Sequence, residues 1–170
     1  MLITCPKGLE NRTASNIYFI LRSDLNDKDC KCSLSKFQGV VYGYTSTNPD
    51  LAISFIKNEL KKNIWYLGKF GKIIPLHKIS SINMDDIINS AIELSQKIRT
   101  LDSYKIEIKN RDKKIDSMLI IEKIAEKITR KVDLKNPDKI LRIEIFENFC
   151  GLSVIDDSLI IKAPKEILNL

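Results

Sequence analysis

The spacing of hydrophobic residues changes along the chain, and these changes predict an α+β protein. In the first half, short apolar runs alternate with segments whose apolar residues recur every three or four positions. The predicted order is strand, helix, strand, strand, helix, strand, which is the split βαβ pattern of a ferredoxin-like unit. The segments are residues 2–5, 9–22, 32–37, 39–45, a helix after Asn48, and 64–80.

The second predicted helix has the clearest start signal. Asn48 is a good N-cap, Pro49 suits the first helical position, and Asp50 complements the helix dipole. The apolar residues that follow repeat with helical spacing and predict a core-facing stripe of Ala52, Ile53, Ile56 and Leu60.

The second half, from near Asn83, repeats the mixture of helix and strand. Residues 104–109 alternate apolar and charged side chains as a half-buried strand does. Residues 116–132 give the longest helical pattern, and further strands are expected at 139–146, 152–155 and 159–162. The helix pattern predicts a core stripe of Ile121, Ile124, Ala125, Ile128 and Val132. We therefore expect two domains, residues 1–78 and 79–170.

Composition agrees with a folded chain that could bind a polyanion. Of the 170 residues, 44% are hydrophobic and 29% charged, which suffices for a core. The net charge of +6 and the pI near 9.1 are compatible with RNA binding without requiring it. No apolar run approaches the ~20 residues of a membrane span, and the N-terminus lacks the pattern of a signal peptide. We expect a cytoplasmic protein with reduced cysteines and no membrane partner.

A search for catalytic motifs finds no complete set. The chain has neither a Walker-type phosphate loop nor a Gly-x-Gly-x-x-Gly turn. His77 is the only histidine, and we interpret it as a strand residue whose imidazole is hydrogen-bonded. Cys30 and Cys32 have no second cysteine pair at metal-binding distance. The sequence predicts no catalytic residues, no metal and no cofactor.

Positive charge gathers around the predicted helix at 116–132. Lys123, Lys127 and Lys131 follow at intervals of four, which would align them on one face. The stripe has two readings, a solvated helix face or a phosphate-binding surface, and basic residues both before and after the helix favour the second.

Three segments in order carry a resemblance to a known family. They are residues 104–111 (YKIEIKNR), residues 132–138 (VDLKNPD), and residues 141–145 (LRIEI) leading to 151–154 (GLSV). Together they resemble the THUMP domain, the RNA-binding module of several tRNA-modifying enzymes. In the second of them Asp133 can bond nearby backbone, and residues 136–138 predict a turn that launches the next strand.

The resemblance implies a ferredoxin-like unit followed by a THUMP domain, and a role in tRNA modification. The chain is similar to the archaeal and eukaryotic adaptors that help a tRNA cytidine acetyltransferase form N4-acetylcytidine in the D arm. By that likeness, it would hold the acceptor end and backbone of tRNA without catalysis and without binding DNA. The expected RNA-binding residues are Lys109, Arg111, Lys113, Lys114, Lys131, Lys135, Asn136 and Arg142, with Lys69 and Lys72 near the domain junction.

Two other functional classes stay open at this point. The chain could be the RNA-binding half of a split tRNA methyltransferase or thiouridine-forming enzyme, or a protein–protein adaptor that does not contact RNA. For the tRNA-binding class we expect the pair Arg111→Glu and Lys135→Glu to abolish binding while the fold survives.

Overall fold

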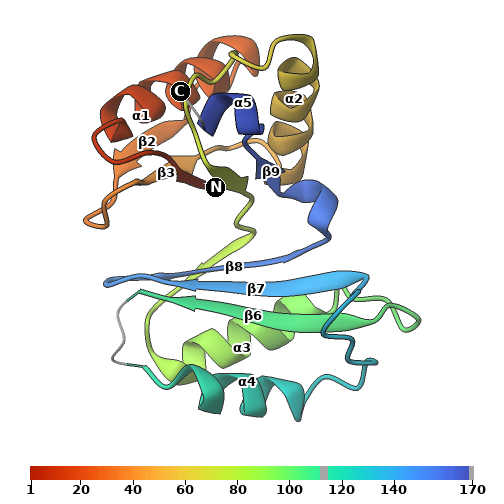
Figure 1. Cartoon of the computed structure of the whole chain (residues 1–170). Coiled ribbons are helices and arrows are strands. Elements are labelled where there is room, and N and C mark those ends of the chain that lie inside the picture. The colour runs from red at the N-terminus through yellow and green to blue at the C-terminus, as the bar shows by residue number, and fades with distance from the viewer. Residues whose placement is uncertain (112–114, 169–170) are drawn as a thin grey trace. The chain divides into compact units, whose positions relative to one another are not determined.

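The computed structural model describes residues 1–111 and 115–168, and the chain divides into two compact units (Figure 1). The first unit comprises Met1–Pro75 together with the segment that begins at Leu159, and the second comprises Leu76–Ser158. The sequence had suggested domains of residues 1–78 and 79–170. The structure differs at the C-terminal end, because strand β9 (Ile161–Lys162) pairs with strand β4 (Lys72–Ile74) of the first unit.

The first unit has the strand order of a ferredoxin-like fold with one strand added. Its sheet runs β2-β3-β1-β4-β9, and all neighbouring strands are antiparallel. Leu2 lies opposite Tyr42 on one side and Ile74 on the other, so β1 is central. The remaining elements are β1 (Leu2–Thr4), α1 (Glu10–Phe19), the π-helical turn η1 (Ile20–Asp24), β2 (Lys31–Leu34), β3 (Val40–Tyr44), α2 (Pro49–Lys62) and α5 (Lys165–Leu168).

Helix α2 forms as its sequence predicts. The Asn48 side chain accepts a hydrogen bond of 2.8 Å from the backbone N–H of Asp50, which confirms the cap. The predicted stripe is also confirmed, because its members are buried in the core of the first unit with Ile3, Val41 and Ile73 of the sheet. They are Ala52, Ile53, Ile56 and Leu60.

The second unit is a sheet with two helices on one face (Figure 1). Its strand order is β5-β8-β7-β6, with β6 parallel to β7 and the other pairs antiparallel. Leu141, Ile143 and Ile145 of β7 pack in the helix-covered core, while Arg142 and Glu144 alternate with them along the strand. The elements are β5 (Lys78–Ser80), α3 (Met84–Ser95), β6 (Tyr104–Asn110), α4 (Ser117–Ala125), β7 (Lys139–Ile145) and β8 (Cys150–Ile155); the 3₁₀ turn η2 (Asp157–Leu159) contains the boundary between the second unit and the last segment of the first.

Helix α4 is shorter than the sequence pattern predicts. It starts where expected, since Asp116 accepts hydrogen bonds from Met118 and Leu119, but it ends at Ala125 rather than Val132. The chain then turns so that Val132 bridges Tyr104 of β6 in parallel register. The predicted basic stripe is therefore wrong, because of its lysines only Lys123 belongs to the helix.

The predicted core stripe of this helix is correct only in part. Ile124 and Ile128 are buried, whereas Ile121 is half-buried, Ala125 is exposed and Val132 is 54% exposed. Ile120, which the pattern omitted, is fully buried. None of the described helices is both long enough and apolar enough to cross a membrane.

Candidate nucleic-acid interface

Residues 131–138, here called the 131–138 loop, lie beside the amino end of β6. The backbone N–H of Tyr104 donates to the carbonyl of Lys131 at 2.8 Å, and the N–H of Asp133 donates to the carbonyl of Tyr104 at 2.9 Å. These bonds attach the first residues of the loop to a strand whose other side pairs with β7. The hydrogen bonds to Tyr104 therefore fix the position of residues 131–133 beside β6.

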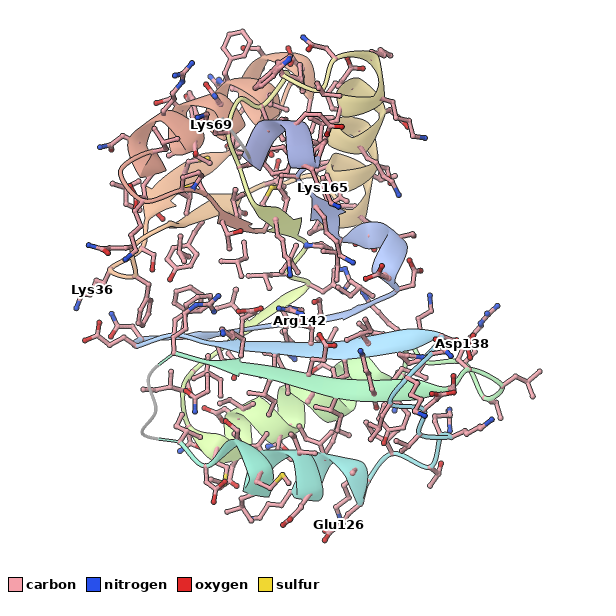
Figure 2. The ribbon with its side chains drawn as sticks, in the orientation of Figure 1. Lys36, Lys69, Glu126, Asp138, Arg142 and Lys165 are labelled. Carbon is pink, nitrogen blue, oxygen red and sulfur yellow. The ribbon has the colours of Figure 1, made fainter. Side chains whose placement is uncertain are left out.

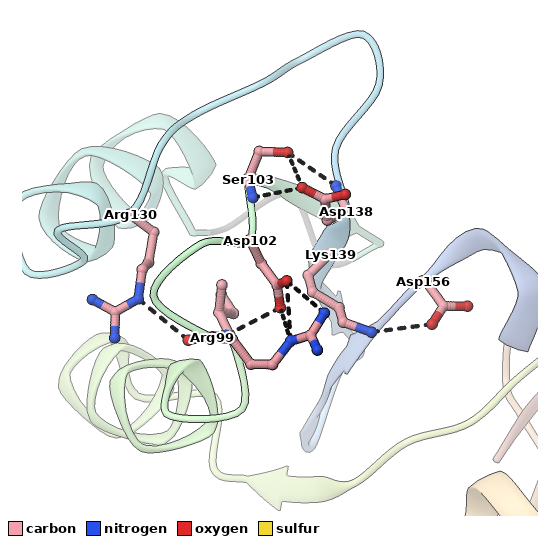
Figure 3. A network of polar contacts seen from close by, with 8 residues as sticks. Arg99, Asp102, Ser103, Arg130, Asp138, Lys139 and Asp156 are labelled. Carbon is pink, nitrogen blue, oxygen red and sulfur yellow. Dashed lines mark hydrogen bonds and ion pairs between the residues drawn. The ribbon is translucent and has the colours of Figure 1, made fainter.

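Two aspartates shape the rest of the loop. Asp133 Oδ1 accepts from the N–H groups of Lys135 (3.0 Å) and Asn136 (2.9 Å), as an Asx turn does. Asp138 Oδ2 accepts from the N–H (2.8 Å) and the hydroxyl (2.7 Å) of Ser103 (Figure 3). These hydrogen bonds lower the pKa of both carboxyls below the usual aspartate value, so both stay ionised at neutral pH. The sequence predicts a turn at residues 136–138; the chain bends at residues 134–136 and again at Asp138, and β7 begins directly after Asp138.

A second layer of polar contacts supports this end of the unit. Arg99 pairs with the buried carboxylate of Asp102 at 2.9 Å, and Arg130 Nε donates to the carbonyl of Ile98 at 3.3 Å (Figure 3). The hydrogen bond from Arg130 to Ile98 therefore connects the segment after α4 to the segment after α3. Lys139, the first residue of β7, pairs with Asp156 at 3.1 Å.

The loop presents exposed polar and charged side chains. Lys131, Lys135 and Asn136 are all exposed, and the charge of Lys131 is one of the influences that lower the pKa of Asp133 on the same loop. Leu134 is 73% exposed on the same loop, and Leu101 is 97% exposed on the neighbouring turn. We call Lys131, Leu134, Lys135 and Asn136 the loop surface. Its charges suit phosphates and its apolar side chain suits an unstacked base.

The cations that follow β6 and lie on its neighbour β7 have a different environment. Arg111 pairs with the fully buried carboxylate of Glu144 and stacks over the Phe146 ring, 4.9 Å from its centroid. Arg142 reaches Glu144 and Glu107, each at 2.7 Å. Their side chains are only 15% and 17% exposed, respectively. Arg111 and Arg142 therefore neutralise buried or half-buried carboxylates within the unit; Arg142 is labelled in Figure 2.

The predicted RNA-binding residues do not form one cluster. Strand β6 has seven residues, and a strand rises roughly 3.3 Å per residue, so its two ends lie about 20 Å apart. Lys109 is exposed near the carboxyl end, while Lys131 and Lys135 lie at the amino end. Lys69 is half-buried and Lys72 is exposed in the first unit. Lys113 and Lys114 lie outside the described residues.

The histidine and two of the cysteines are hydrogen-bonded or protonated. His77 Nδ1 accepts from the backbone N–H of Val154 at 3.3 Å, which confirms the hydrogen-bonded imidazole, although His77 lies between β4 and β5 rather than in a strand as predicted. Burial raises the pKa of Cys150 to about 12 and that of Cys32 to about 11, so these thiols stay protonated at neutral pH. Within residues 1–111 and 115–168, no group of three or more potential metal-binding side chains is found.

Comparison with known proteins identifies the second unit. The sequence model of the THUMP domain family matches residues 81–155, which run from just after β5 to the end of β8. The second unit is a THUMP domain. The match contains the 131–138 loop and β6, so both ends described above belong to the THUMP domain.

Two curated relatives extend the match. The chain is 34% identical over 96 residues to the THUMP domain-containing protein 1 homolog of Drosophila melanogaster, covering 52% of this chain and 30% of that protein. It is 24% identical over 173 residues to an uncharacterised protein of Methanocaldococcus jannaschii, covering 99% of this chain and 44% of that protein. The chain spans less than half the length of each relative.

Solved structures share the fold at low sequence identity. PH1313 of Pyrococcus horikoshii matches with a TM-score of 0.70 and 16% identity over 95% of this chain and 54% of that chain. A 4-thiouridine synthetase, solved in complex with RNA and ATP, matches with a TM-score of 0.56 and 14% identity over 95% of this chain and 42% of that chain. TrmN from Thermus thermophilus matches with a TM-score of 0.60 and 13% identity, over 90% of this chain and 44% of that chain. These likenesses concern the fold alone.

The sequence analysis did not identify the carboxylates that pair with the arginines near β6. Glu107 and Glu144 neutralise Arg111 and Arg142, and Asp102 binds Arg99. The available signal was the alternation of side chains along a strand, which places Glu107 and Glu144 away from the core. Alternation does not show which cation each carboxylate contacts.

Proposed function

We propose that this chain binds tRNA through its THUMP domain and, without catalysis of its own, presents the tRNA to a separate cytidine acetyltransferase that forms N4-acetylcytidine in the D arm. The match of residues 81–155 to the THUMP family carries this proposal. The likeness of half the chain to a THUMP domain-containing protein 1 homolog supports the accessory role.

The loop surface is the proposed main contact. Lys131 and Lys135 would bind phosphates, and the Asn136 side chain can both donate to and accept from RNA groups. Because the two aspartates hold the loop in one conformation, binding would lose little chain entropy. Lys109, Lys69 and Lys72 are further proposed phosphate contacts, as are Lys113 and Lys114, which lie outside the described residues. Arg111 and Arg142 would add positive potential without leaving their ion pairs.

The first experiment tests RNA binding and the part of tRNA that is recognised. Affinity of the purified chain is measured for intact tRNA and for the same tRNA without its last three nucleotides, over a series of salt concentrations. We expect salt-dependent binding that weakens on trimming, because unpaired ends offer base edges that paired stems hide. Equal affinities for both RNAs would remove the acceptor-end part of the proposal, and no binding would remove the proposal.

The second experiment tests the enzyme that is served. The tRNA modifications of cells lacking this chain are profiled, and candidate enzymes are assayed with and without the purified protein. Loss of N4-acetylcytidine is the expected result. Loss of a methylated or thiolated nucleoside would instead identify the chain as the RNA-binding half of a split enzyme, the alternative that the folds of TrmN and the 4-thiouridine synthetase favour.

A further inference from the structure

The first unit contains a pocket outside the THUMP domain, and Lys69, a proposed phosphate contact, is one of its lining residues. Its volume is about 270 Å³, and α1 and the turn before β4 supply its walls. The lining residues that matter for its chemistry are Leu9, Arg12, Asn16, Trp65, Gly68 and Lys69.

Local hydrogen bonds form the pocket. Arg12 and Asn16 are one helical turn apart on α1 and so share a face. The Asn16 side chain donates to the carbonyl of Leu67 at 2.9 Å, which fixes the turn to the helix. The N–H of Gly68 donates to the carbonyl of Trp65 at 2.9 Å, and Gly68 has a φ of +68°, a conformation that favours glycine.

The side chains around the pocket combine an aromatic face with positive charge. Trp65 is 45% exposed, although an indole ring is costly to leave in water. Arg12 is exposed and Lys69 half-buried, and neither has an acidic partner within residues 1–111 and 115–168. No carboxylate lines the pocket. An apolar wall formed by Leu9 completes a site for a flat, partly apolar group attached to an anion.

We propose that this pocket binds one unpaired nucleotide of RNA, with the base on the indole of Trp65 and its phosphate between Arg12 and Lys69. The inference rests on the proposed function in that the nucleotide belongs to the bound tRNA. The pocket lies just below the ~300–1,000 Å³ of pockets for drug-sized ligands, so it suits one base rather than a longer segment. Aromatic side chains beside cations are how proteins bind single-stranded nucleic acid without reading sequence.

Trp65 itself reports on this binding, because it is the only tryptophan in the chain. Its fluorescence is followed in the full chain during titration with intact tRNA, with a single-stranded trinucleotide, and with free AMP. A base stacked on the indole should quench the emission. We expect saturable quenching by tRNA and by the trinucleotide, and at least 10-fold weaker binding of AMP because it lacks neighbouring phosphates.

Variants separate the pocket from general charge and aromatic effects. Arg12→Ala combined with Lys69→Ala should weaken the trinucleotide quenching by at least 10-fold, whereas Lys28→Ala with Lys61→Ala, two exposed lysines outside the pocket, should not. Trp65→Leu should weaken binding of a labelled trinucleotide by about 5- to 150-fold, the range for loss of one stacked base. Phe19→Leu, which changes an exposed aromatic outside the pocket, is the control.

Each outcome decides a separate point. If neither RNA quenches Trp65, or if Trp65→Leu binds the trinucleotide like the wild type, the pocket proposal is overturned. If AMP binds as tightly as the trinucleotide, the pocket is a site for free nucleotides, and its assignment to RNA is overturned. If the trinucleotide quenches Trp65 but tRNA does not bind, the pocket stands and the proposed function fails. If tRNA binds without quenching, the proposed function stands and the pocket fails.

Discussion

The guanidinium of Arg111 pairs with the carboxylate of Glu144, whose side chain has no exposed surface. Arg142 holds the other oxygen of that carboxylate at 2.7 Å, so one buried negative charge is shared by Arg142 of β7 and by Arg111, which directly follows β6. A buried carboxylate is costly unless it is paired and hydrogen-bonded. The arginines therefore stabilise the THUMP domain, whatever they add to RNA binding.

Arg111→Glu should destabilise the protein rather than only weaken RNA binding, in contrast to the sequence-based expectation that the fold survives. The new carboxylate would face Glu144, and removing one partner of a buried pair costs about 3–5 kcal/mol. Lys109→Glu is the control on the same strand, because its exposed side chain should change stability by less than ~0.5 kcal/mol. Urea unfolding of both variants checks this, and equal midpoints would contradict it.

Reversal of the loop charges should weaken tRNA binding while the fold is retained. Lys131→Glu with Lys135→Glu removes two proposed phosphate contacts, which should reduce the slope of log affinity against log salt by about 1.4–1.8. The control pair Lys28→Glu with Lys61→Glu changes net charge equally, but on the first unit. A filter-binding salt series on both pairs makes the comparison. Equal losses would mean that net charge alone governs binding and that the loop surface is not the site.

Asp133→Ala should weaken tRNA binding although it makes the protein more positive. The substitution removes the acceptor for the N–H groups of Lys135 and Asn136, so the loop would no longer hold its proposed contacts in one conformation. Asp157→Ala removes the same charge from a different turn of the chain and serves as the control. We expect a loss of several-fold for the first variant only. Tighter binding by both variants would show that the loop conformation is irrelevant.

Asp27 should make the first unit sensitive to acid. Burial raises the pKa of its carboxyl, but hydrogen bonds from Ser46, Thr45 and Asp29 outweigh that effect and lower it to about 2, below the unfolded value of 3.8. A group whose pKa falls on folding stabilises the protein above its unfolded pKa, and that contribution is lost as pH falls through the folded pKa.

The stabilisation by Asp27 should therefore be complete above about pH 5 and should disappear between about pH 4 and pH 2. Asp27→Asn cannot carry the charge at any pH. The difference in unfolding free energy between wild type and this variant, measured from pH 6 to pH 2, should shrink on acidification. A difference that stays constant with pH would show that the carboxylate charge does not contribute.

Local signals in the sequence predicted the elements that local interactions determine. The cap at Asn48 and the turn at Asp133 both arise within three residues of the chain, and both are present. Helix α4 was predicted too long because Ile124 and Ile128 keep helical spacing and are both buried. The backbone after Ala125 instead follows the pairing of Val132 with Tyr104, a contact between residues far apart in sequence.

The site was harder to predict for the same reason. Arg111 and Lys135 look alike in the sequence, but one is paired with a glutamate 33 positions away and the other has no acidic partner in the described part of the chain. A count of basic residues cannot separate cations that stabilise the fold from cations that are available to a ligand. The assignment of residues 159–162 to the second domain failed similarly, because Ile161 pairs with Ile73.

The return of β9 to the first sheet affects how the protein forms on the ribosome. The described strands of the THUMP domain all precede Ile161 in the sequence, whereas the first sheet gains its last strand only with Ile161 and Lys162. Nascent domains tend to fold as units in the order of their synthesis. The THUMP domain lies in the sequence between the two segments of the first unit. Its strands can therefore pair before β9 completes the sheet of the first unit.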